Sequence, residues 1–86
     1  MTSQAWQTRA FMATPASMAA VATGRRAALS LTREQAATLA DVPPALIDQI
    51  EAGAPARLDV DGVYRLFDAL GVKVLALPGT LIGLPG

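Results

Sequence analysis

The stretch Leu31–Gly53, LTREQAATLADVPPALIDQIEAG, decides how this chain folds. It predicts a short helix that begins after Thr32, a tight turn at residues 41–42, and a second short helix over residues 43–51. Gly53 is typical of the residue that follows a helix end, where a left-handed backbone is needed. Two short helices joined by so tight a turn form a helix-turn-helix unit.

Local signals support both helices of this unit. Thr32 and Gln35 have the spacing of a capping box, in which each side chain bonds to the other residue's backbone N–H. The turn holds Asp41, so a left-handed backbone there depends on the tolerance of Asp for that conformation. Apolar residues at helical spacing predict the buried faces, namely Ala36, Ala37, Ala40, Ile47 and Ile50.

Two further helices and a strand flank the unit. Thr14-Pro15 predicts the start of a helix that reaches about Leu29. Asp59 predicts the cap of another that ends at Leu70, before Gly71. Its buried stripe is Val63, Leu66, Phe67 and Leu70. Residues 72–77, VKVLAL, are strand-like.

The chain therefore divides into three parts. Residues 1–13 form an N-terminal arm in which Trp6 is expected as a packing anchor, residues 14–71 form the helical domain, and residues 72–86 form a strand and apolar tail. A lone strand needs a partner, and the same strand of a second subunit would provide one. We expect this dimer contact at Val72, Val74 and Leu75. The alternative is a strand folded back on its own domain, paired with residues 5–12.

Composition restricts the function. The chain has 86 residues, zero formal net charge, no Cys and no His. This excludes disulfides and removes the commonest metal ligand and general base. There is also no glycine-rich phosphate loop. We therefore expect no enzyme, no cofactor and no metal site. The absence of a signal peptide or a long apolar run predicts a cytoplasmic protein without membrane contact.

The motifs resemble the Xre/Cro/C1 class of helix-turn-helix transcriptional regulators. The class pattern is matched by Leu31, Thr32, Ala37, Val42, Ile47, Glu51 and Gly53, by an Arg six places before the Thr cap, and by RLDVDGVYRLFDALG after the unit. The resemblance covers residues 14–71. It implies an all-α, lambda-repressor-like DNA-binding bundle of four to five short helices.

The TP start of the first helix and the strand after the fourth also resemble HipB-type antitoxins. Members of that group are small homodimers whose C-terminal strand pairs across the dimer. Their partner is a kinase-like toxin encoded alongside. The resemblance thus implies a homodimer with a C-terminal strand in its interface and a cognate toxin as a possible second partner.

The class pattern also implies the residues that would contact double-stranded DNA. Arg25 and Arg33 are expected on phosphates, and Thr32 is expected as a cap whose backbone N–H can face a phosphate. The first positions of the second helix of the unit are unusual, because they hold Pro44, Ala45 and Leu46. Ala45 or Leu46 could touch a thymine methyl group, and Gln49 could read an adenine.

Each of these expectations has an alternative. Arg33 and Gln49 could be solvated surface residues, and Leu46 could instead contact a protein or pack inward. Arg26 and Glu51 occupy the positions of a structural ion pair between the first helix and the end of the third. The remaining acids need no catalytic explanation, because Asp59 and Asp61 suit a helix start.

The sequence therefore predicts a transcription regulator of the Xre type, expected to be a repressor and possibly an autoregulating antitoxin, that binds a palindromic operator as a homodimer. The alternative is a degenerate helix-turn-helix that acts as a protein-protein interaction module, such as a toxin-neutralising protein without specific DNA binding. Zero net charge and the apolar tail 81–85 favour this alternative, because DNA-binding domains are usually basic.

Overall fold

A computed structural model describes residues 8–53 and 58–78, in which four helices and two strands occur. Their order is β1 (Thr8–Phe11), α1 (Pro15–Ala28), α2 (Arg33–Ala40), α3 (Pro44–Glu51), α4 (Val60–Ala69) and β2 (Val72–Ala76). The chain is thus mostly helical with a small sheet. Trp6 and the apolar tail 81–85 lie outside the described residues.

The helix ends follow the signals in the sequence. The Thr14 hydroxyl accepts a hydrogen bond from the Ser17 N–H at the start of α1. Thr32 and Gln35 form the predicted capping box at the start of α2. Asp59 stands at the cap of α4, but its side chain makes no capping hydrogen bond there. Local hydrogen bonds therefore fix where the first two helices begin.

The turn between α2 and α3 is left-handed at Asp41, with φ 58° and ψ 51°. Asp replaces the Gly that would adopt this conformation without strain. Gly53 after α3 and Gly71 after α4 also have positive φ. A left-handed residue cannot continue an α-helix, so each of these positions marks a helix end.

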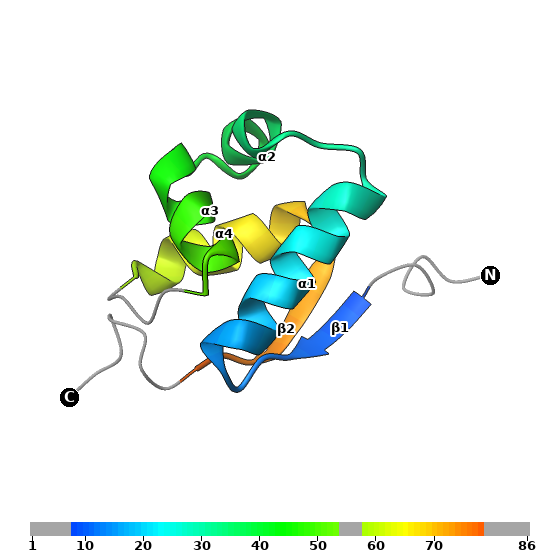
Figure 1. The fold of residues 1–86 in the computed structure, drawn as a ribbon, viewed down its shortest axis with the longest axis vertical. Helices are drawn as coiled ribbons and strands as arrows, with labels where there is room; N and C mark the ends of the chain where they lie inside the picture. Colours follow the sequence, from blue (N-terminus) through cyan, green and yellow to red (C-terminus); the bar gives the residue numbers. More distant parts are fainter. Residues whose placement is uncertain (1–7, 54–57, 79–86) are drawn as a thin grey trace.

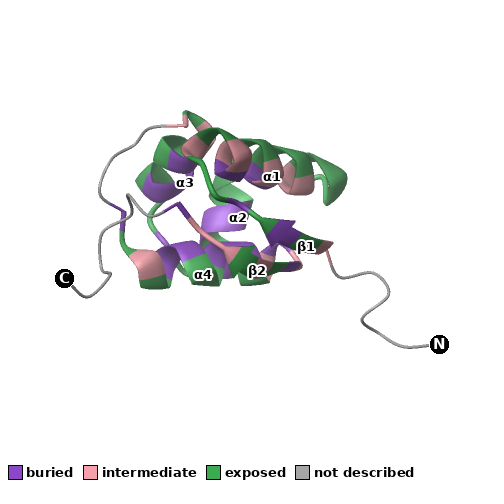
Figure 2. Cartoon of the chain, turned by 90° about the horizontal axis from the view of Figure 1, so that it is seen from below, coloured by how far each residue is buried: buried purple, intermediate pink, exposed green. Residues whose placement is uncertain are grey.

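One apolar core joins all the elements. Figure 2 shows α1 and α3 on one side and α4 with β2 on the other, with buried residues between them. Every residue predicted for the stripes of α2, α3 and α4 is buried, whereas Leu29 at the end of α1 is exposed. The core also takes up Met12, Met18, Leu58 and Val72.

The sheet corrects one expectation from the sequence. The strand after α4 does have a partner within its own domain, because β2 pairs in parallel with β1 and Thr8 lies opposite Val72. This matches the alternative in which the strand folds back on residues 5–12. Val72 is buried, Val74 is half-buried and packs against the core, and Leu75 is exposed.

The α2–α3 unit and the sheet lie at opposite ends of the molecule, with α2 at the top of Figure 1 and β1 at the bottom. Helix α1 runs between them across the front of the view. None of the helices in the described part of the chain has the length and apolar character needed to cross a bilayer.

Candidate nucleic-acid interface

The outward side of α3 is the candidate interface, because α2 and α3 have the predicted arrangement of two short helices and a tight turn. Leu46, Ile47 and Ile50 face the core. Pro44, Ala45, Asp48 and Gln49 are exposed. Helix α3 therefore shows one narrow surface stripe, and its buried face fixes the direction in which that stripe points.

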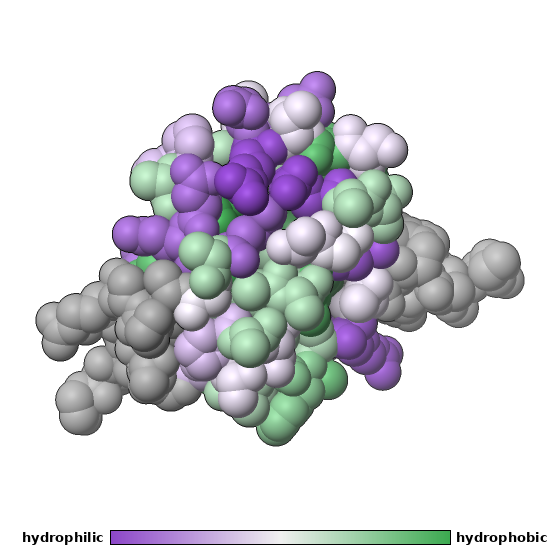
Figure 3. All heavy atoms as spheres, viewed as in Figure 1, coloured by the Kyte–Doolittle hydropathy of each residue, from purple (hydrophilic) through white to green (hydrophobic). Residues whose placement is uncertain are grey.

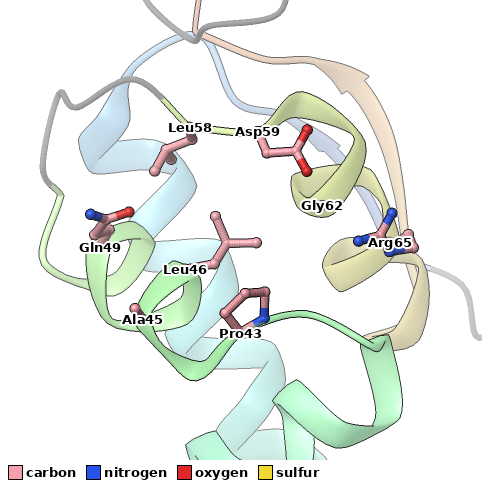
Figure 4. A pocket seen from close by; sticks show the side chains of 8 residues that line it. All are labelled: Pro43, Ala45, Leu46, Gln49, Leu58, Asp59, Gly62 and Arg65. Atoms are coloured by element: carbon pink, nitrogen blue, oxygen red, sulfur yellow. The ribbon is translucent and has the colours of Figure 1, made fainter.

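Leu46 does not belong to the exposed stripe, which corrects its assignment as a DNA contact. Only 7% of its surface is exposed, and Figure 4 shows its side chain directed from α3 toward α4. A Cβ atom on Gly62 would lie 3.0 Å from the Leu46 Cδ2 atom. The missing side chain at Gly62 thus lets α4 come close enough to bury Leu46, which cannot reach a base without leaving the core.

An open hollow of about 250 Å³ lies between the start of α3 and the start of α4. Pro43, Ala45 and Gln49 line it from α3 and the turn before it, and Asp59, Gly62 and Arg65 line it from α4 (Figure 4). Arg65 pairs with Asp61 and donates to the Asp41 carbonyl oxygen at 3.3 Å. Arg65 therefore ties α4 to the turn, a role that the i,i+4 spacing of Asp61 and Arg65 only partly signals.

Arg26 and Glu51 form a bidentate ion pair at the positions expected from the sequence. Arg26 Nε and Nη2 donate to the two carboxylate oxygens of Glu51 at 2.7 and 2.9 Å. A third bond joins Arg26 Nη1 to the Leu31 carbonyl oxygen at 3.0 Å. The pair thus connects α1, the α1–α2 junction and the last residue of α3, and only 4% of the Glu51 side chain is exposed.

This geometry shifts the pKa of both partners. The hydrogen bonds from Arg26 lower the pKa of the Glu51 carboxyl below its ordinary value, although burial acts in the opposite direction. The same hydrogen bonds raise the pKa of the Arg26 guanidinium. A carboxylate at the end of a helix opposes the helix dipole, so the two arginines beside Glu51 also offset that cost.

Arg33 is the second of these arginines. Its Nε donates to Glu51 Oε1 at 3.2 Å, and its Nη1 donates to Asp48 Oδ1 at 3.3 Å. About half of the side chain remains exposed, at 51%. Arg33 thus reaches the surface beside α3, but its charge is largely matched by two carboxylates of the same protein.

Arg25 forms a hydrogen bond within the domain that the sequence did not predict. Its Nε donates to the Leu70 carbonyl oxygen at 3.0 Å, at the end of α4. A cation there satisfies a free carbonyl group and complements the helix dipole. Two arginines were expected on phosphates. Arg33 lies beside α3, where such a contact is open to it, whereas Arg25 lies against the end of α4, which corrects its assignment as a phosphate contact.

The charge balance of the candidate interface is acidic. Residues 31–53 hold four acidic side chains and one basic one, Arg33. The Glu51 side chain is almost fully covered and is paired with Arg26, so three exposed acids remain against one exposed base. Figure 3 shows hydrophilic side chains gathered over the end that carries α2, and more hydrophobic ones over α1 and β1. The described residues contain no group of three or more side chains suited to hold a metal. What this surface offers is Gln49, small apolar groups and one paired arginine.

Comparison of the chain with protein-family models, with curated proteins and with solved structures finds no match.

Proposed function

We propose that this protein is a DNA-binding transcription regulator that inserts the exposed stripe of α3 into the major groove. The observation that carries the proposal is the exposure of Ala45 and Gln49 on a short helix whose other side is fixed in the core. An Ala methyl group can contact the thymine methyl group, and a Gln amide can form two hydrogen bonds with the major-groove edge of adenine, donating to N7 and accepting from the N6 amino group. Gln49 would therefore supply most of the hydrogen-bonded base reading.

Arg33 is the proposed phosphate contact. Its bond to Asp48 joins two side chains that are each more than half exposed, at 51% and 59%, and such pairs contribute only about 0–1 kcal/mol. Exchange of Asp48 for a phosphate therefore costs little. The capping box uses the backbone N–H groups of Thr32 and Gln35, so Thr32 does not offer its N–H group to a phosphate as expected. The backbone N–H groups of Arg33 and Glu34 would supply the second phosphate contact.

The proposed active species is a homodimer that acts as a repressor on a palindromic operator, with one α3 helix in each half-site about 34 Å apart. One edge of β2 pairs with β1. The opposite edge of β2 remains the proposed contact between subunits. A HipB-like antitoxin role, with a toxin as a further partner, is the proposed specialisation. A cytoplasmic location belongs to the same proposal.

Fluorescence anisotropy with labelled DNA from upstream of the gene, across a salt series, tests this function. With one or two phosphate contacts per subunit, we expect a slope of about −2 to −4 in log K against log salt for the dimer. Arg33→Ala should weaken binding about tenfold and reduce the slope. The matched control Arg9→Ala removes an equal charge from the distant sheet and should change affinity less than twofold.

A second candidate function is a protein-protein interaction module without specific DNA binding. The three exposed acids against one exposed base over residues 31–53 favour it, because such a surface repels phosphates. In that case the upstream DNA binds no tighter than random DNA at about 50 mM salt, where electrostatic attraction is strong. The same result would contradict the DNA-binding proposal.

A further inference from the structure

The outer face of the two-stranded sheet carries an unusual set of side chains. Arg9 and Phe11 alternate with buried Ala10 in β1, and Lys73 and Leu75 lie outward in β2. Phe11 is 72% exposed and Leu75 is 55% exposed. We call these four residues, Arg9, Phe11, Lys73 and Leu75, the outer sheet face. The strand period of two places them on the side away from the core.

The two cations of this face stand side by side. Arg9 lies opposite Lys73 in the parallel register, and like charges in paired positions destabilise a sheet. Neither residue forms an ion pair with any acid in the described part of the chain. The pair therefore adds an electrostatic cost that an anionic partner would remove.

The two apolar side chains lie next to these cations. The register is irregular between Ala10 and Phe11, so that Phe11 is paired with Ala76 and Leu75 occupies the extra position of the bulge. Both are large side chains that stay exposed although the domain has a complete core. A partner that covers them gains about 25 cal/mol for each Å² of apolar surface removed from water.

Neither face-to-face contact of two copies nor DNA matches this combination. Two copies of the outer sheet face in contact would bring four cations together without an acid between them. A DNA backbone would match Arg9 and Lys73 but would leave Phe11 and Leu75 without an apolar partner. A protein segment with both acidic and apolar side chains would satisfy all four residues.

We propose that the outer sheet face binds a partner protein through an extended segment that carries acidic and large apolar side chains in turn at every second position, so that both kinds lie on the same side of the segment. The acidic side chains pair with Arg9 and Lys73, and the apolar ones cover Phe11 and Leu75. The contact is small, so it forms a weak or transient complex by itself. The proposal does not depend on DNA binding, because it uses the end of the molecule opposite to α2.

Synthetic peptides of about twelve residues can represent the proposed partner. The acidic-apolar peptide carries Glu and Leu in turn at every second position with Thr between them, a second peptide has Lys in place of Glu, and a third has Ser in place of Leu. Two-dimensional NMR of the labelled full-length chain follows their binding. We expect the acidic-apolar peptide to bind at least tenfold tighter than either other peptide and to shift the amide signals of Arg9, Phe11, Lys73 and Leu75.

Matched variants separate a specific contact from general attraction. Arg9→Gln with Lys73→Gln should weaken binding of the acidic-apolar peptide at least tenfold. The control Arg33→Gln with Arg65→Gln removes the same charge elsewhere and should change binding less than twofold. Phe11→Ser with Leu75→Ser should also abolish binding, whereas Leu39→Ser, an exposed leucine on α2, should not. Urea unfolding verifies that each variant folds.

Three results would overturn the proposal. The first is no binding of the acidic-apolar peptide at concentrations up to about 1 mM, because the dissociation constant would then exceed about 1 mM. The second is equal binding of the Lys peptide or equal loss in the control variants. The third is a dimer in sedimentation that becomes a monomer on Phe11→Ser alone. Phe11 lies in β1, away from the β2 edge proposed for the subunit contact, so a second copy would then be the occupant of the outer sheet face.

Discussion

The two ends of this molecule treat their charges in opposite ways. At the α2–α3 end, Arg26 and Arg33 are both paired with acids, and Glu51 receives bonds from each of them. At the sheet end, Arg9 and Lys73 lie side by side without an acid paired to them in the described part of the chain. Internal ion pairs fix the shape of the first end, whereas the second leaves its two positive charges uncompensated at the surface.

The largest expected effect is on stability, because loss of a charged residue should destabilise the α2–α3 end far more than the sheet end. Glu51→Ala leaves Arg26, whose side chain is only 20% exposed, without its carboxylate partner, and should lower the free energy of unfolding by about 3 kcal/mol. Arg9→Ala, the control at the sheet end, should change it by less than about 0.5 kcal/mol. Urea unfolding followed by circular dichroism measures both. Equal losses would contradict the assigned difference between the ends.

Acid should weaken the same end selectively. The pKa of Glu51 is lowered in the folded state, so its contribution is complete above the unfolded value of about 4.3 and is lost as pH falls through the lower, folded value. We expect the stability difference between wild type and Glu51→Gln to be constant near neutral pH and to shrink below about pH 4.3. A difference that grows in acid would exclude the ion pair as its cause.

The surface charge of α3 gives a smaller effect, on binding. Asp48→Asn removes the acid that neutralises Arg33 at 3.3 Å and that repels phosphates. We expect affinity for random DNA to rise about threefold to fivefold, or about 1 kcal/mol or less. Asp68→Asn, an exposed acid on α4, serves as the control in the same anisotropy measurement. An equal rise for Asp68→Asn would mean that net charge alone is responsible.

The smallest effect concerns the turn before α3. Asp41 has φ 58°, which Gly adopts without strain, so Asp41→Gly should stabilise the domain by about 0.5 kcal/mol after the larger entropy loss of Gly is counted. Ala52→Gly changes a residue with φ −75° and should instead destabilise it by up to about 1 kcal/mol. Thermal unfolding compares the two variants. A loss in Asp41→Gly would show that the Asp side chain stabilises the turn.

Local features of the fold were predictable from the sequence. The Thr14 and Thr32 caps and the helix ends at Gly53 and Gly71 depend on a few adjacent residues. The buried stripes of α3 and α4 depend only on helical spacing. For this reason, the four helices, the strand β2 and most of the core were predicted correctly, whereas β1 was considered only as an alternative partner for β2.

Contacts between distant segments were less predictable. The sequence left β2 with two alternative partners, because the strand pattern contains no information about which distant segment lies beside it. Arg25 resembled a phosphate contact, but it bonds to Leu70, 45 positions away. For Leu46, the sequence left open both a DNA contact and inward packing. Its burial depends on Gly62, which lies on another helix, so the spacing within α3 could not decide between them. Site residues are therefore harder to predict than helices, since each depends on tertiary neighbours.

The division of roles between the two ends can be tested most directly by NMR titration of the labelled protein with a duplex of its upstream DNA. We predict that the amide signals of Ala45 and Gln49 in α3 and of Arg33 in α2 shift on DNA addition, while those of Arg9 and Lys73 do not. Shifts confined to Arg9, Lys73 and their strands, with α3 unchanged, would contradict the proposed interface.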